Sequence, residues 1–403
     1  MKVLLIRREN VCNGSLDSFL DGIRDGFEAS GAKTGILDVS NDPTHIPSEE
    51  KIRELSDSNY DAVLTFNSVG QQNYMIDNVN LWDAMGIPFI NYIVDHPVHH
   101  KNAMTEHGDN YYVICIDKNH LEYNKKFNPT IKETYFIPLG GINFGDYNEI
   151  YSEEGYFSRS IDFLFTGTYL PLSTIEDKIN EYPKPVKKLI YRHIEYMLDH
   201  RNTSEEEGLI HILSDMGIDP EKVELQNYIF ATRLTEEFVK TYLREEMIRY
   251  LIDAGLNIKI YGNGWDRFDA DMKNTICYPG VAYDDMKSLY LSSKVILNHS
   301  SHFKQGMHDR IPSAMLAGAA VLTDNNPYID TLFKEGLSEG ELCTYNVSSP
   351  QLVPDIAKGM FSDPHMLYEM TLRANKKARA ELTWDCRARE ILDIIKTIKE
   401  QRL

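Results

Sequence analysis

The sequence predicts an α/β protein built from two doubly wound parallel sheets. Short apolar runs alternate with amphipathic helical patterns along most of its 403 residues. This alternation is typical of parallel sheets that are covered by helices on both faces. The length exceeds one ordinary core and suits two domains.

The first series of apolar runs predicts an N-terminal domain over residues 1–150. After the first run, apolar residues recur at helical spacing until Gly31 supplies a stop, so we expect a helix packed on the sheet. The recurring residues are Leu16, Phe19, Leu20, Ile23 and Phe27. The expected strands lie at residues 2–6, 35–39, 61–66, 88–94 and 112–116.

A second series follows a break in the pattern. A Gly-rich turn at 138–141 leads into a polar, aromatic stretch up to Arg159, where we place the interdomain linker. A second domain is expected over residues 151–380, with a helical insertion at about 172–255. A C-terminal helix over 381–403 is expected to pack back toward the N-terminal domain. The expected strands of the second domain lie at residues 161–166, 257–261, 295–298 and 320–323.

The composition narrows the class of partner. Lys and Arg total 42 against 61 Asp and Glu, so the net charge of −19 argues against nucleic acid, and any bound anion must be held locally. No stretch approaches the roughly 20 apolar residues of a transmembrane segment, and five scattered cysteines are typical of reduced thiols. We expect a cytoplasmic protein. The acidic surface and the helical insertion are compatible with a homo-oligomer or a protein partner, but solvated charge is the commoner explanation of both features.

Two glycine-containing loops follow strands of the second domain, at the edge where open parallel sheets bind ligands. Gly167, Thr168 and Tyr169 would let backbone N–H groups approach a phosphate, although an ordinary strand-ending turn explains them equally. The loop at 262–265 is either the wall of a ligand site or a tight turn with a packed tryptophan. Its residues are Gly262, Asn263, Gly264 and Trp265.

The segment 298–310 concentrates cationic donors ahead of a predicted helix. Lys304, Arg310 and three histidines precede a helix that begins near Pro312, and the positive end of a helix favours anions. The pattern predicts an anion site, with a solvated polar loop as the alternative. The histidines also allow a metal site, but they lack the helical H-x-x-x-H spacing, so we expect no metal. They are His299, His302 and His308.

Asp95 and His96 follow the expected strand at 88–94 of the first domain. A carboxylate and an imidazole at the carboxyl end of a strand suit proton transfer or acceptor orientation, with Pro97 fixing the turn. The alternative is a capping aspartate beside a solvent-exposed histidine. Asp117, after the next strand, is expected to cap a helix.

The run from Pro279 through Arg310 to Thr323 carries the most specific family pattern in the chain. It resembles the donor-binding half of the two-domain GT-B glycosyltransferases, and more closely of their bacterial spore-maturation-type (CgeB-like) branch. Shorter matches lie at 94–97 and 136–141. The resemblance covers most of the chain and implies two Rossmann-like domains facing each other across a cleft. With the loops above, it implies that the donor is bound by Val281, Tyr283, Asn298, Gln305, Gly306, Met307, His308, Asp309 and Ser313.

The resemblance also implies a reaction. A nucleotide-diphosphate sugar would be the donor, with no required cofactor, and the acceptor would be a protein, a cell-envelope glycan or a small molecule. Arg310 and Lys304 would meet the charge on the departing diphosphate, while Asp95 or His96 would act on the acceptor. Related retaining enzymes carry two glutamates where this sequence has Gln305 and Ser313, so retention is favoured only weakly.

Other functions compete with transfer to an acceptor. A nucleotide-sugar epimerase or hydrolase would consume the donor without an acceptor. A non-catalytic sugar-nucleotide-binding protein would explain the missing glutamates. A dinucleotide oxidoreductase is disfavoured because Arg7, Arg8, Glu9 and Asn10, rather than a G-x-G-x-x-G pattern, follow the first strand.

Overall fold

The computed structural model describes residues 1–9, 11–40, 48–71, 75–76, 79–144, 152–300 and 302–402. The chain forms two compact units. Unit 1 comprises Met1–Asn143, Ala282–Asp284 and Ala380–Leu403, and unit 2 comprises Phe144–Val281 and Asp285–Arg379. Residues 145–151 of the expected linker lie outside the described residues.

Unit 1 contains a parallel sheet whose six described strands lie in the order β2-β1-β3-β6-β7-β8. Strands β3, β6 and β7 are buried at every residue, which explains their continuous apolar sequences. The sequence pattern missed the edge strand β8, in which only Thr134 is buried. The strands are β1 (Lys2–Arg7), β2 (Lys33–Asp38), β3 (Ala62–Phe66), β6 (Phe89–Ile93), β7 (Tyr111–Cys115) and β8 (Glu133–Phe136), and a separate hairpin pairs β4 (Met75–Ile76) with β5 (Val79–Asn80).

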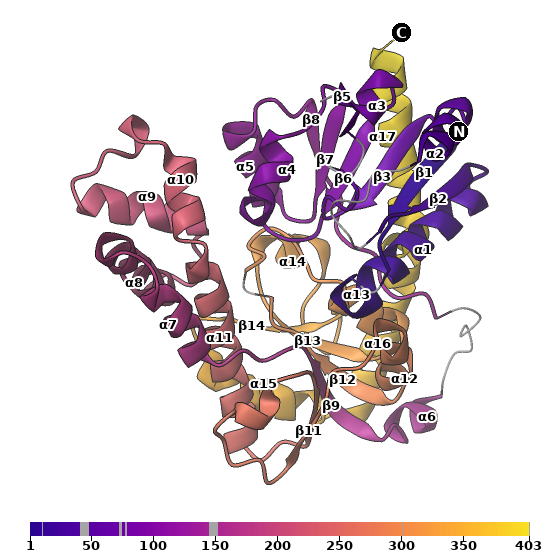
Figure 1. Cartoon of the computed structure of the whole chain (residues 1–403). Helices are drawn as coiled ribbons and strands as arrows, with labels where there is room; N and C mark the ends of the chain where they lie inside the picture. Colours follow the sequence, from indigo (N-terminus) through magenta and orange to yellow (C-terminus); the bar gives the residue numbers. More distant parts are fainter. Residues whose placement is uncertain are drawn as a thin grey trace. The chain divides into compact units, whose positions relative to one another are not determined.

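Helices cover this sheet (Figure 1). The predicted helix after β1 is present, and its apolar residues are buried. The α-helices of unit 1 are α1 (Ser15–Ala29), α2 (Glu49–Asp57), α3 (Leu81–Ala84), α4 (Lys101–Thr105), α5 (Lys118–Phe127) and α17 (Trp384–Gln401). The 3₁₀ turns η1 (Val11–Gly14) and η2 (Pro97–His100) precede α1 and α4, and η5 (Tyr283–Asp285) starts in the 282–284 segment.

Helix α17 lies along α1 and completes the core of unit 1 (Figure 1). The two helices approach closely because α1 has glycines where they meet. A Cβ atom on Gly22 would lie 2.6 Å from Cγ of Trp384, and one on Gly26 would lie 2.6 Å from Cβ of Ala388. The Trp384 ring also packs against Phe19, with ring centres 5.0 Å apart.

Unit 2 contains a second parallel sheet whose six described strands lie in the order β11-β10-β9-β12-β13-β14. This is the order of the dinucleotide-binding folds. Two edge strands were missed by the sequence pattern, because β11 is mostly exposed or half-buried and β14 has three residues. The strands are β9 (Ile161–Thr166), β10 (Ile258–Tyr261), β11 (Thr275–Tyr278), β12 (Ser293–Leu297), β13 (Ala320–Asp324) and β14 (Cys343–Tyr345).

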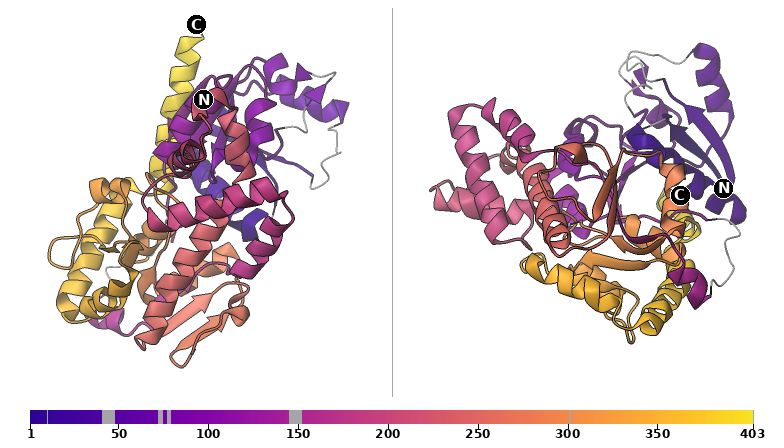
Figure 2. Two further views of the ribbon diagram at one scale, coloured as in Figure 1. Left: turned by 90° about the vertical axis from the view of Figure 1, so that its left-hand side faces the viewer. Right: turned by 90° about the horizontal axis from the view of Figure 1, so that it is seen from below.

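The predicted helical insertion is present between β9 and β10 (Figure 2). One of its helices, α9, begins with a capping box in which Ser204 and Glu207 satisfy each other's backbone N–H groups. The insertion contains α7 (Leu172–Asn180), α8 (Lys184–Asp199), α9 (Glu205–Asp215), η3 (Pro220–Lys222), α10 (Leu225–Ala231) and α11 (Leu234–Asp253). The other helices are α6 (Glu153–Phe157), η4 (Trp265–Arg267), α12 (Met286–Leu291), α13 (Arg310–Leu316), α14 (Pro327–Leu332), η6 (Pro350–Leu352), α15 (Val353–Met360) and α16 (Pro364–Glu381).

None of the helices in the described part of the chain has the length and apolarity needed to cross a bilayer.

We expect Gly22→Ala to destabilise unit 1. Alanine favours a helix over glycine by up to about 1 kcal/mol, but its methyl group would overlap the enclosed Trp384 ring, and overpacking of this kind costs about 1–3 kcal/mol. The apparent melting temperature should therefore fall. Gly359→Ala on α15 is the matched control, since a Cβ there meets nothing within 4 Å and should leave the melting temperature equal or higher. Equal effects of the two substitutions would contradict the close packing of α1 and α17.

Candidate functional site

The carboxyl ends of β9 and β12 meet at the topological switch point of unit 2. The two strands are neighbours, but the chain continues from β9 toward β10 on one side and from β12 toward β13 on the other. Open α/β sheets bind ligands in the crevice that forms where the strand order reverses in this way. The residues beyond these two strand ends are therefore the candidate ligand site.

Arg310, which the sequence singled out, lies across this switch point. Its Nε donates a hydrogen bond to Thr166 Oγ1 at 3.1 Å, and its Nη1 donates to Asn298 Oδ1 at 2.6 Å. The Asn298 amide donates in turn to Thr323 Oγ1 at 2.8 Å, which orients its carbonyl oxygen toward the guanidinium. Arg310 is thus a buried cation held between the ends of β9 and β12.

Arg244, which the sequence analysis missed, is a second cation at the same place. Helix α11 projects it so that Nη1 donates to Thr168 O at 2.7 Å, while Nε is enclosed and has no hydrogen-bond partner among the described residues. The Arg244 and Arg310 guanidinium groups lie 5.7 and 5.8 Å from the centre of the Phe165 ring. Burial and the charge of Arg310 lower the pKa of Arg244 to about 10, so it remains cationic at neutral pH.

These two cations make the switch point a candidate anion site. Neither guanidinium forms an ion pair with a carboxylate of the described residues. Enclosed charge without a counter-ion is costly, and arginine donors are suited to phosphate oxygens. A bound phosphate would supply the missing countercharge and a partner for Arg244 Nε.

The three histidines do not add charge, contrary to the sequence expectation. Burial and the nearby Arg244 and Lys304 charges lower the pKa of His299 well below its ordinary value, and burial lowers the pKa of His302 and His308 as well. Each is therefore neutral at pH 7. The part of the chain that the structure describes contains no group of three or more His, Cys, Asp or Glu residues that could hold a metal ion.

The described residues of the segment 298–310, which are 298–300 and 302–310, are folded into unit 2 rather than solvated. Two side chains at the end of β13 and just after it anchor this segment. Asp324 Oδ1 accepts from Ser300 N at 2.9 Å, and Asn326 Nδ2 donates to the carbonyl oxygens of Phe303 and Gly306 at 2.9 and 3.0 Å. Lys304 is also buried, and its ammonium donates to Arg201 O at 2.6 Å.

The other donor-binding residues expected from this segment occupy different environments. Asn298, Met307 and Ser313 are fully buried, whereas Gln305 and His308 are partly exposed. The donor-binding roles of these residues, and of Gly306 and Asp309, stay predictions.

The two glycine-containing loops hold each other in place. A Cβ on Gly262 would lie 2.0 Å from Gly167 O, and Tyr169 N donates to Asn263 O at 2.9 Å. Trp265 is buried and donates from its indole N–H to Gly167 O at 2.7 Å. The loop after β10 is therefore a tight turn with a packed tryptophan, and its glycines allow close backbone approach. Thr168 and Asn263 are exposed, and donor binding by these loops stays a prediction.

Tyr283 and Val281 fall in different units. Tyr283 belongs to unit 1, where its ring packs edge-on against Phe19 with ring centres 5.5 Å apart. Val281 belongs to unit 2. Their expected contacts with a donor stay predictions.

Asp95 and His96 have separate roles in unit 1. His96 is buried, and its Nδ1 accepts from Val98 N at 3.1 Å, so it caps the 3₁₀ turn η2. Asp95 is exposed, and its Oδ2 accepts from Asn67 Nδ2 at 2.8 Å. The sequence analysis offered a capping aspartate beside an exposed histidine. The structure shows the opposite arrangement, in which the histidine caps the turn and the aspartate is exposed. Asp117 caps α5 as predicted, accepting from Asn119 N at 2.7 Å.

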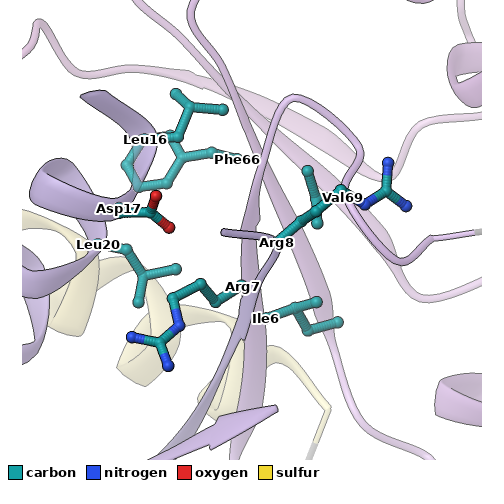
Figure 3. Close-up of a pocket in the computed structure, with 8 residues that line it drawn as sticks. All are labelled: Ile6, Arg7, Arg8, Leu16, Asp17, Leu20, Phe66 and Val69. Atoms are coloured by element: carbon teal, nitrogen blue, oxygen red, sulfur yellow. The ribbon is translucent and has the colours of Figure 1, made fainter. Parts of the chain in front are cut away.

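A pocket lies at the carboxyl ends of β1 and β3, which is the switch point of unit 1 (Figure 3). Its cavity volume is about 10 Å³, which is room for about one water molecule. Arg7 at its edge is bound to Asp38, with Nε 2.6 Å from Oδ1. The pocket is lined by Ile6, Arg7, Arg8, Leu16, Asp17, Leu20, Phe66 and Val69.

The sequence matches a known protein family over part of its length. Residues 240–393 match the family model described as "Glycosyl transferase-like". That range contains Arg244, Asn298, Arg310 and Asp324. A sequence search of curated proteins finds no match.

Several solved glycosyltransferase structures share the fold over the whole chain. A sucrose-phosphate synthase from Thermosynechococcus elongatus matches with a TM-score of 0.54 and 9% identity, covering 100% of both chains. A glycosyltransferase from Rickettsia africae matches with a TM-score of 0.56 and 10% identity, covering 98% of both chains. HepE from Anabaena, in complex with UDP-glucose, matches with a TM-score of 0.51 and 12% identity, covering 100% of this chain and 99% of that one. The two parallel sheets thus form the GT-B fold of these structures, and residues 240–393 are similar to the glycosyl transferase-like family.

We expect Asp324 to make stability depend on pH. Burial raises its pKa to about 6 from an ordinary value of 3.8, so the folded protein binds this proton more tightly than the unfolded chain does. The resulting stabilisation is complete below pH 4 and is lost as the pH rises through 6. Between pH 4 and 7 the wild-type protein should lose about 2 kcal/mol of unfolding free energy that Asp324→Asn does not lose.

Denaturant unfolding at a series of pH values measures this difference. Asp355→Asn, which changes an exposed aspartate on α15, is the control and should follow the wild-type profile. Parallel profiles for the wild-type protein and Asp324→Asn would show that Asp324 does not titrate in this range.

Proposed function

We propose that this protein is a metal-independent glycosyltransferase that moves a sugar from a nucleotide-diphosphate sugar to an acceptor. Unit 2 binds the donor, and its diphosphate lies at the switch point between β9 and β12. The family match over residues 240–393 and the UDP-glucose complex of the similarly folded HepE support this donor class. We further propose that the chain belongs to the CgeB-like branch and acts in the cytoplasm.

The pair of arginines at the switch point, Arg244 and Arg310, is the observation that supports this function most directly. When the bond between the anomeric carbon and the diphosphate breaks, its electron pair leaves with the nucleoside diphosphate. Arg310 is held in place by Thr166 and Asn298, and Arg244 has an enclosed Nε without a partner. Both can therefore meet the developing charge without first being reorganised.

Unit 1 supplies the acceptor side of the proposal. Asp95 is an exposed carboxylate at the carboxyl end of β6, where it is able to accept a proton from an acceptor hydroxyl. His96 is assigned a capping role instead, because its Nδ1 is used by Val98 N.

A second candidate is a non-catalytic nucleotide-sugar-binding protein. Gln305 and the fully buried Ser313 stand where related retaining enzymes carry glutamates, which favours this alternative. A hydrolase or epimerase is the third candidate. Product analysis separates the three, because a binding protein leaves the donor intact and a hydrolase or epimerase consumes it without an acceptor.

A melting-temperature panel of UDP-, GDP-, dTDP- and ADP-linked sugars, with and without Mg²⁺, tests donor binding. A donor at 100 times its Kd stabilises the folded state by about 2.7 kcal/mol, so one base should raise the melting temperature without the metal. Arg244→Met should weaken this binding about 10-fold or more, since it removes charge-assisted hydrogen bonds.

Arg249→Met is the matched control on the same helix. Arg249 donates to Asp269 O at 2.7 Å and lies over the Phe268 ring, so its loss should leave the donor shift unchanged. No shift with any nucleotide sugar would overturn the proposed function. A shift that Arg244→Met leaves intact would remove Arg244 from the site.

A further inference from the structure

Two consecutive residues directly after β3 have a left-handed backbone without being glycine. Asn67 has a φ of 47° and Ser68 has a φ of 62°. Such conformations are uncommon for residues with a side chain, and they persist where the surrounding structure enforces them. Gly70, three residues farther on than Asn67, has a φ of 73° and shows that the same turn also uses glycine.

A buried polar network enforces this conformation. Asn91, in the middle of β6, is fully buried, and it holds Ser68 at two points: Ser68 N donates to Asn91 Oδ1 at 2.9 Å, and Asn91 Nδ2 donates to Ser68 Oγ at 2.8 Å. Asn91 Nδ2 also donates to Tyr111 Oη at 2.6 Å, and Tyr111 donates to Gln71 Oε1 at 3.1 Å. Because a buried amide without partners is costly, the network and the turn stabilise each other.

The conformation directs the Asn67 side chain from the end of β3 to the end of β6. Its Oδ1 accepts from Val94 N at 2.9 Å, and its Nδ2 donates to Asp95 Oδ2 at 2.8 Å. The Asn67 side chain therefore forms hydrogen bonds with both Val94 and Asp95, the two residues joined by the Val94–Asp95 peptide bond. The Asp95 side chain remains 56% exposed, and His100 Nε2 lies 3.8 Å from the same Oδ2.

We propose that Asn67 is a positioning residue that holds the Asp95 carboxylate toward the acceptor, and that the acceptor presents a hydroxyl group to it. This inference rests on the proposed function. In the transfer step the acceptor oxygen bonds to the anomeric carbon and its proton passes to Asp95. The bond from the anomeric carbon to the diphosphate breaks, and its electron pair leaves with the nucleoside diphosphate.

A turn alone does not account for the asparagine. Glycine adopts a positive φ at no steric cost and would satisfy the backbone equally well. Asparagine tolerates the conformation and adds an amide whose two ends reach Val94 N and Asp95. The strained left-handed backbone at Asn67 and Ser68 thus helps to orient the exposed carboxylate of Asp95.

The test is a double-mutant cycle with Asn67→Gly and Asp95→Asn. The assay measures release of the nucleoside diphosphate from the nucleotide sugar that gives the largest melting shift, with water and with glycerol as acceptors. We expect Asp95→Asn to lower kcat about 100-fold and Asn67→Gly about 10-fold, with little change in the KM of the donor. The double variant should be no slower than Asp95→Asn, because Asn67 acts through Asp95.

Asn59→Gly is the matched control. Asn59 is exposed between α2 and β3 and has a φ of 49°, so the substitution makes the same chemical change and relieves the same kind of strain away from Asp95. Asn59→Gly should keep the wild-type kcat. Asn59→Gly should melt at or above the wild-type temperature. Asn67→Gly relieves the same kind of strain but loses the hydrogen bonds to Val94 N and Asp95, so its melting temperature should fall by only a few degrees.

The outcomes separate this role from the proposed function. Independent effects of Asn67→Gly and Asp95→Asn, or a wild-type rate in Asn67→Gly, would overturn the positioning role alone. A large fall in the melting temperature of Asn67→Gly would assign Asn67 a structural role instead. No release by the wild-type protein with any donor would overturn both proposals.

Discussion

Arg310 joins the carboxyl ends of β9 and β12, and the arrangement of unit 2 around the switch point depends on it. Its guanidinium satisfies Thr166 and Asn298 and yet keeps its full positive charge. In a chain with a net charge of −19, an anion is attracted to such a place only if the cations are enclosed together and shielded from the acidic surface. Helix α11 meets this condition by bringing Arg244 to the same point.

Much of the surrounding structure keeps these cations in place. Asp324 and Asn326 anchor the segment before Arg310, while Arg159 donates to the carbonyl oxygens of Ala317 and Gly318 at the end of α13. The segment and the short helix are thus fixed at both ends. Groups that are fixed before a ligand arrives lose little entropy on binding, which is the usual advantage of a preorganised site.

The sequence predicted the central strands because burial on both faces leaves an apolar run. It missed β8 and β11, which are edge strands with mixed burial, and β14, which has only three residues. It predicted Arg310 because a loop rich in cationic donors stands out. Arg244 stayed hidden because a lone arginine in a helical pattern is typical of a solvated face, and its role depends on where α11 packs. The capping role of His96 depends on a ring orientation that no sequence pattern encodes.

Unit 1 is completed by α17, a helix that is synthesised only after all of unit 2. The Trp384 side chain packs into unit 1 against Phe19, but it follows all of unit 2 along the chain. A nascent chain therefore leaves the ribosome with the α1 face of unit 1 uncovered until the rest of the protein has emerged. During that interval the face of α1 that carries Phe19 and Gly22 is open to chaperones and to wrong partners, so the emergence of α17 sets the time at which unit 1 matures.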